Sequence, residues 1–323
     1  MAVRNSTDAG FFLVGGRNLL STLTGFSDKK TAVTEETTVL GVSAPTHAFT
    51  GIVRSMFSMD GFYDDATGSQ NEALVGNTGT AQVVCYAPAG NVLGRVVEGM
   101  LGAFFNTYER IVQLEKFHRA KASAEVSGAR EPGVILATLG TVTAAGNTEA
   151  TSVDHTTDPT TQTIAITSNS IAAASVVTCP VPHGLATNDV VLIAGVATSN
   201  PTINGERTVT YLSPTTFSVP VNVTTGGTGG TFTRASTPNG GAGYLQINAL
   251  TLDGYTNVIF KIRHSANNSS FTDLVTFVAT IASPTAQRVA VTGAVNRYLA
   301  TSHAYTGGGT SPSVTRMIGF CRG

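Results

Sequence analysis

The chain has no tryptophan, and charged residues account for only 12% of its 323 positions. That charged share is about half of what is usual in soluble domains. A surface so poor in charge dissolves badly as a monomer, so we expect much of it to become an interface in a large assembly. The lack of tryptophan, with aromatic residues at 7%, also removes the stacking platforms that sugar-binding sites normally use.

The sequence also lacks an excess of either charge sign. Its formal net charge is -1, and its longest basic run is the pair Lys29-Lys30. This excludes the basic footprint of a protein that binds nucleic acid tightly or reads its sequence. No stretch reaches the ~20 apolar residues of a membrane span, and the apolar run near the N-terminus is too short for a signal peptide. We therefore expect a protein that is made in a cytoplasm and has no membrane partner.

Signs of catalytic or metal chemistry are scarce. The three cysteines, Cys85, Cys179 and Cys321, lie far apart without a C-x-x-C pair, which excludes a disulfide framework and a zinc knuckle. The motifs G-x-S-x-G and H-E-x-x-H do not occur. The acidic stretch DGFYDD lacks the ligand spacing of a calcium loop. The sequence predicts no enzyme, no cofactor and no metal site.

One stretch, CPVPHGLATNDVVLIAGV, does bring a cysteine, a histidine and an aspartate together, at Cys179, His183 and Asp189. Two prolines hold the chain extended after the cysteine, and His183-Gly184 and Asn188-Asp189 have the chemistry of turns. We therefore expect His183 to bond a turn carbonyl and Asp189 to accept hydrogen bonds from loop N–H groups. The stretch is interpreted as a structural turn.

The abundant residues, Gly, Thr, Ser, Ala and Val, are typical of an all-β protein. Strict alternation in FHRAKASAEVSG, residues 117–128, predicts a strand with one charged face and one small-residue face. Apolar residues at spacings of three and four between Val92 and Val112 predict one helix, although its glycines leave part of it open to an extended form. The fold class predicted is mainly β, a β-sandwich or barrel with one helix.

Composition divides the chain into three parts. Residues 1–150 read as an N-terminal β domain that includes the helix. Residues 160–236 have few charges, loose flanks and about five short β runs, which predicts an inserted small β-barrel or sandwich. Residues 240–323 return to clean alternation and predict a C-terminal β-sandwich. An Asp-Gly-aromatic turn in each outer part, at Asp60-Gly61 and Asp253-Gly254, would fit two tandem copies of one fold.

Two resemblances follow from these segments. PHGLATNDVVLIAGV, continuing to TINGERTVTYLSPTTFSV, resembles a small β-barrel module that recurs as an insert in bacteriophage structural proteins. Four other segments resemble tail tube (major tail) proteins of long, flexible-tailed phages. Two are N-terminal, GRNLLSTLTGFSDKKTAVTEETTVLG and DGFYDDATGSQNEALVG, and two are C-terminal, FKIRHSANNSSFTDLVTF and QRVAVTGAVNRYLATSHAYTGGGTSPSVTRMIGFCRG. This family implies a β-sandwich or barrel protomer that closes into rings, with the rings stacking into a hollow tube through which DNA leaves the capsid.

The resemblance implies a structural virion protein of the tail, assembled in the host cytoplasm, with the inserted module facing outward. Its partners would be copies of itself and other tail proteins, namely the tape measure, terminator and distal tail proteins. A ring would contain three tandem chains in a pseudo-sixfold arrangement or six chains. The alternative is a receptor- or carbohydrate-binding tail protein.

A conduit for DNA must not hold phosphates, so its lumen should be acidic or neutral. Six acidic residues are therefore candidate lumen or inter-ring contacts. They are Asp28, Glu35, Glu36, Asp60, Asp64 and Asp65.

Overall fold

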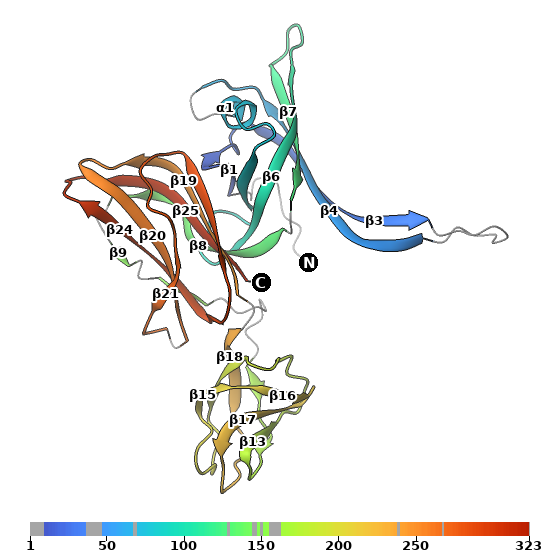
Figure 1. Ribbon diagram of the computed structural model, residues 1–323, viewed down its shortest axis with the longest axis vertical. Helices are drawn as coiled ribbons and strands as arrows, with labels where there is room; N and C mark the ends of the chain where they lie inside the picture. The colour runs from blue at the N-terminus through green and yellow to red at the C-terminus, as the bar shows by residue number, and fades with distance from the viewer. Residues whose placement is uncertain are drawn as a thin grey trace, which may run out of the picture.

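The computed structural model describes residues 10–36, 47–66, 70–127, 130–143, 147–148, 151–154, 163–237, 240–266 and 268–322. Within these ranges the regular structure consists of antiparallel strands in four sheets and one short helix, α1 (Gln70–Val75). Figure 1 shows the strands forming two neighbouring β units and a smaller third unit below them. The mainly β fold predicted from composition is confirmed.

The largest sheet joins the N-terminal and C-terminal parts of the chain. Its spine follows the order β2-β1-β5-β6-β8-β25-β19-β22, and β7, β4 and β3 continue from β6 as a branch. The eleven strands are β1 (Phe11–Val14), β2 (Arg17–Asn18), β3 (Leu23–Glu36), β4 (His47–Phe62), β5 (Ala81–Ala87), β6 (Val96–Ile111), β7 (Arg119–Val126), β8 (Glu131–Val142), β19 (Gly241–Thr251), β22 (Thr285–Val291) and β25 (Ser313–Arg322). Because β25 pairs with both β8 and β19, the two outer parts share one sheet.

The segment predicted as a helix is strand β6, so that prediction is wrong. Its first half lies between β5 and β8 and buries side chains on both faces, with Val97 and Met100 each 1% exposed, although its first residue, Val96, is exposed. A strand that is covered on both sides has near-continuous apolar residues, and this imitates a helical stripe. Gly102, with a φ of 69°, bends the strand where its partner changes from β8 to β7. The one described helix, α1, lies elsewhere.

Strand β19 also has two buried faces. Ala242 and Tyr244 face β1, β5 and β6, while Leu245 and Ile247 face the second sheet. That second sheet consists of β9 (Asn147–Thr148), β10 (Val153–Asp154), β20 (Tyr255–Ser265), β21 (Thr272–Thr276) and β24 (Tyr298–Gly307). Phe260 of β20 and Phe320 of β25 belong to the core between the sheets. The middle of the large sheet is therefore covered on both sides.

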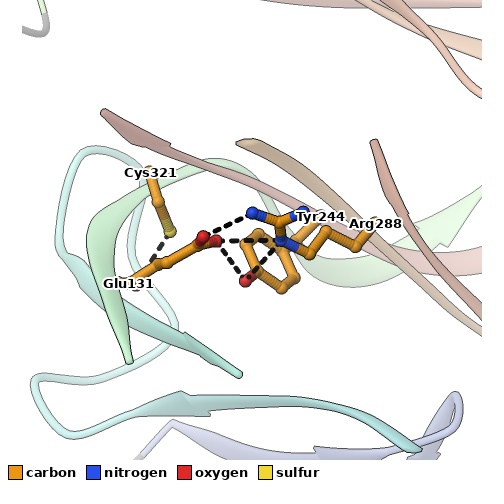
Figure 2. A network of polar contacts seen from close by, with 4 residues as sticks. All are labelled: Glu131, Tyr244, Arg288 and Cys321. Atoms are coloured by element: carbon orange, nitrogen blue, oxygen red, sulfur yellow. Dashed lines mark hydrogen bonds and ion pairs between the residues drawn. The ribbon is translucent and has the colours of Figure 1, made fainter. Parts of the chain in front are cut away.

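A polar network ties this buried region together (Figure 2). Arg288 of β22 forms an ion pair with Glu131 of β8, and the Tyr244 hydroxyl donates to Glu131 Oε2 over 2.5 Å. The Cys321 thiol donates to the Glu131 main-chain oxygen at 2.9 Å. Burial and the neighbouring Glu131 carboxylate raise the pKa of Tyr244, which keeps the hydroxyl protonated as a donor. The network links four strands that are remote in sequence.

The third unit has its own core. It contains β11 (Ile164–Ala165), β12 (Ser168–Asn169), β13 (Ala173–Thr178), β14 (Val190–Ala194), β15 (Gly205–Thr208), β16 (Thr210–Ser213), β17 (Thr216–Asn222) and β18 (Thr231–Thr237), in two sheets. Val177, Phe217 and Phe232 are buried between them. Strand β18 also pairs with β23 (Val295–Asn296), and Arg297 donates to Thr233 Oγ1 at 3.0 Å. The domain boundaries and the outward orientation of this unit stay predictions.

The Cys-His-Asp stretch lies in this third unit and forms turns. His183 Nε2 donates to the Ser213 carbonyl at 2.9 Å, and its Nδ1 accepts from the Leu185 N–H at 3.0 Å. Asp189 accepts from the Ala186 N–H at 2.9 Å and pairs with Arg234 at 2.8 Å. The prediction that both side chains hold turn backbone is therefore confirmed.

The two Asp-Gly pairs are not equivalent. Asp60-Gly61 lies inside β4, so the predicted turn at that position is wrong, whereas Asp253-Gly254 does form a turn with positive φ at both residues. Gly61 is needed because an added Cβ would come within 2.3 Å of the Thr22 carbonyl. Internal duplication of the chain stays a prediction, now without the support of these turns.

Candidate functional site

The candidate site is the four-stranded branch of the large sheet, in the order β3-β4-β7-β6. Each neighbouring pair is antiparallel. In Figure 1 the β6–β7 hairpin projects from the top of the molecule and the β3–β4 hairpin extends to the right. Beyond the end of β7, which pairs Val126 with Ser55, β3 and β4 continue with only each other as described strand partners.

One face of this branch is packed. Phe57 and Met59 of β4, Phe105 of β6 and the alanines of β7 are buried against β1 and α1. Phe57 meets Phe12 and Phe105 edge to face, with ring centroids 5.9 and 5.7 Å apart. The sequence produces this face by alternation, because every second residue of β4 and β7 is apolar or small. The other face carries mostly polar side chains, together with the partly exposed Met56 and Phe104.

The outer face carries side chains in cross-strand rows, since directly paired residues share a face. One row contains hydroxyl groups from all four strands, and the Thr107 and Ser123 hydroxyls are 2.5 Å apart. On one side of this row, Asp60, Lys121 and Glu109 are paired in register. Lys29, Met56, Glu125 and Phe104 form the row on the other side.

The charges of the outer face are mixed in sign. Its described basic side chains are Lys29, Arg54, Arg119 and Lys121, and its described acidic side chains are Asp60, Glu109 and Glu125. Arg119 and Asp60 form an ion pair at 3.0 Å. A face with alternating signs has no extended positive field and would hold a polyanion weakly.

Both outer edges of the branch are without a strand partner among the described residues. β3 pairs with β4 alone along its whole length. β6 pairs with β5 up to Phe104, and Gly79 donates to the Phe105 carbonyl, but Thr107–Ile111 pairs with β7 only. Unpaired N–H and C=O groups on an edge strand are a template for pairing with another chain. The branch therefore offers two edges at which the sheet could continue.

The six acidic residues predicted as lumen or inter-ring contacts do not form one site. Asp60 lies on the outer face, and Asp28 lies on the opposite face, where it pairs with Arg130, which also pairs with Glu98 at 2.8 Å. Glu35 and Glu36 lie at the far end of β3, about 35 Å along the strand from the level of Asp60. Asp64 and Asp65 follow β4, and Asp65 is exposed. Their role as lumen or inter-ring contacts stays a prediction.

Sequence reasoning overlooked the arginines that pair with two of these acids, Arg119 with Asp60 and Arg130 with Asp28. The signal was present in residues 117–126, whose alternation already placed Arg119, Lys121, Ser123 and Glu125 on one face. That strand prediction is confirmed, with the three alanines of β7 buried. What alternation could not reveal was which strands lie on either side.

Within the described ranges, no three His, Cys, Asp or Glu residues gather in a way that could hold a metal ion. The described part of the chain also contains no helix long and apolar enough to cross a membrane. Burial raises the pKa of the Cys85 thiol to about 12 and that of the Cys179 thiol to about 11, so neither is an activated nucleophile at neutral pH.

Comparison with known proteins gives only distant similarity. No family model and no curated protein matches the chain. Solved structures similar to it include the tail of an empty gene transfer agent particle with C6 symmetry, at 12% identity and a TM-score of 0.30, covering 40% of this chain and 97% of the other. The virion of a native gene transfer agent particle is 13% identical, with a TM-score of 0.27, and the alignment covers 40% of this chain and 97% of the other.

A third similar structure is the SPP1 Dit protein, described as a hub of the adsorption apparatus in phages that infect Gram-positive bacteria. It is 8% identical, with a TM-score of 0.29, and the alignment covers 97% of this chain and 98% of that one. All three neighbours come from phage tails or gene transfer agent particles. At these identities and TM-scores they assign no function to this chain.

Proposed function

We propose that this protein is a structural, non-enzymatic ring protein of a phage tail, and that its rings stack into a hollow tube through which DNA passes. The observation that supports this most strongly is the four-stranded branch, which combines unpaired edges at β3 and at Thr107–Ile111 of β6 with an outer face of mixed charge. Other tail proteins would complete the structure at its ends.

The strand directions suit ring closure. In the order β3-β4-β7-β6 the strands alternate in direction, so β3 and β6 run antiparallel to each other. Under rotation about an axis roughly parallel to the strands, the β6 edge of one protomer would meet the β3 edge of the next in antiparallel orientation. A heterologous contact of this kind generates a closed ring when its rotation closes. Closure also protects both edges from uncontrolled pairing.

The expected size of the barrel favours six chains over three. With four strands from each chain, six chains would give a barrel about 37 to 48 Å across between backbones, at strand spacings near 4.8 Å and tilts up to 40°. Three chains would give about 18 to 24 Å, which side chains alone would largely fill. Only the larger barrel admits a duplex of about 20 Å. The pseudo-sixfold trimer would need two branches of this kind in each chain, and the described residues contain only a single branch.

The outer face suits the lumen of such a barrel. A duplex moving through a channel must meet few fixed cations, because every phosphate contact adds affinity. On this face Lys121 lies between Asp60 and Glu109 in register, and Arg119 pairs with Asp60. These acidic neighbours offset the charges of Lys121 and Arg119 locally. The row of hydroxyl groups beside them adds neutral contacts.

A disulfide scan tests the ring directly. Thr107→Cys on β6 is combined in turn with Gly25→Cys, Ser27→Cys or Lys29→Cys, which are successive outer-face positions on β3. The native cysteines Cys85, Cys179 and Cys321 are buried and should not compete. We expect one combination to give a covalent ladder that ends at six chains on a non-reducing gel. Thr107→Cys with Ser58→Cys on the interior strand β4 is the matched control and should give no ladder.

Negative-stain electron microscopy and light scattering complete the test. Stacked rings or hollow tubes would support the proposal. A ladder that ends at three chains would contradict the sixfold ring. A monodisperse monomer with no ladder in any combination would overturn the ring and favour the receptor- or carbohydrate-binding alternative.

A further inference from the structure

The tip of the β6–β7 hairpin carries an apolar patch on a surface that is otherwise rich in Ser and Thr. Leu114 is 92% exposed, Phe117 82% and Val112 67%, and Phe62 at the end of β4 lies beside them. The Phe62 and Phe117 rings meet edge to face with centroids 5.7 Å apart. Exposed apolar clusters of this kind mark interaction sites.

The backbone of the tip is fixed. The Lys116 N–H donates to the Gln113 carbonyl at 3.3 Å, and the Tyr63 N–H donates to the His118 carbonyl at 3.0 Å. Glu115 adopts a φ of 60°, which completes the turn. A preformed tip loses little conformational entropy when it docks, so its apolar area contributes more fully to binding.

The opposite end of the same strand also exposes apolar side chains. Val92 is 52% exposed and Val96, the first residue of β6, is 44% exposed. Arg95 donates to the Val92 carbonyl, and Ile135 of β8 donates to the Arg95 carbonyl, so this end is held against β8. The two apolar ends lie about 50 Å apart along the strand if it is counted as straight.

We propose that the tip, Val112, Leu114 and Phe117, docks on Val92 and Val96 of a second copy of this chain in the next ring. Unlike ends that fit each other form a heterologous contact, and such a contact repeats by translation into an open stack. A tip-to-tip contact would stop at two rings and leave Val92 and Val96 bare. The inference rests on the proposed ring, whose barrel strands direct the tip toward the neighbouring ring.

The test uses the full chain with the double substitution Leu114→Asp and Phe117→Asp. Both positions are exposed, so we expect unchanged thermal unfolding and intact single rings. Light scattering should give a mass near six chains of 33.2 kDa each, and micrographs should show isolated rings in place of tubes. Val278→Asp with Ile281→Asp is the matched control, because these residues are 73% and 71% exposed on another surface. The control should form tubes like the wild type.

A second variant identifies the receiving surface. Leu114→Cys combined with Val92→Cys should give disulfides between rings, with covalent species larger than six chains, and either single variant should give none. Tubes of wild-type length from the Leu114→Asp, Phe117→Asp variant would overturn the inference while leaving the ring intact. Wild-type rings that pair and stop at two would overturn it as well. If the wild type forms no rings under any condition, the proposed function fails first and the inference with it.

Discussion

Two regions of the same eleven-stranded sheet differ in how many of their faces are buried. Around β8, β25 and β19 both faces are buried. Tyr244 is fully buried on one face, and Leu245 and Ile247 are fully buried on the other. In the β3-β4-β7-β6 branch only one face is buried, and both outer edges lack partners among the described residues. The first region holds the protomer together. The second, by this account, is kept open for neighbouring protomers.

The largest difference should appear when a charge is removed from the buried region. Arg288→Ala leaves the Glu131 carboxylate without its ion pair beside Tyr244, so we expect a loss of about 2 to 4 kcal/mol in the free energy of unfolding. Urea unfolding measures it. Lys261→Ala, which breaks the more exposed pair with Asp273, is the control and should cost less than about 1 kcal/mol. Equal losses for Arg288→Ala and Lys261→Ala would contradict the distinction between a buried and an exposed ion pair.

A glycine in each region gives the next comparison. An added Cβ on Gly99 would lie 2.5 Å from the Tyr244 ring, whereas one on Gly25 would lie 3.9 Å from its nearest neighbour, Asp60 Cβ. Gly99→Ala should therefore cost about 1 to 3 kcal/mol through overpacking. Gly25→Ala should be close to neutral in the same thermal unfolding assay. A neutral Gly99→Ala would mean that β6 and β19 are packed more loosely than described.

Acid should weaken the second sheet, which covers the buried region, through His264 of β20. Burial, and secondarily the charge of Arg322, lower the pKa of His264 below its ordinary value of about 6.5. The unfolded chain then binds the proton first, so the stabilisation is complete above pH ~6.5 and is lost as pH falls toward the folded pKa. Between pH 7.5 and 5.5 the melting temperature of the wild type should fall more than that of His264→Gln. An equal fall in melting temperature for the wild type and His264→Gln would contradict the role given to His264.

The smallest effect is expected on the outer face. Asp60→Asn removes an exposed ion pair with Arg119 and should change the free energy of unfolding by less than about 1 kcal/mol. Thermal unfolding by circular dichroism is sufficient to measure it. A loss as large as that of Arg288→Ala would show that Asp60 stabilises the fold and is not simply displayed on a surface.

The two regions also differ in how well the sequence predicts them. Strand β7 was predictable because Ala120, Ala122 and Ala124 alternate with longer polar residues. Strand β6 was not, because its first half buries Val97 on one face and Met100 on the other, which weakens the alternation of apolar and polar residues. The open edges could not be predicted, since they depend on which strands lie side by side, such as β4 and β7, whose paired residues Ser55 and Val126 are 71 positions apart.

Amide hydrogen exchange on the unassembled and the assembled protein tests the central claim most directly. The account predicts that the outward-pointing amides of Leu23–Glu36 and Thr107–Ile111 exchange rapidly at the free edges of the single chain and become protected in rings, while β19 is protected in both states. Rapid exchange at both edges in assembled material would contradict it, because neighbouring protomers would then be joined by some other surface.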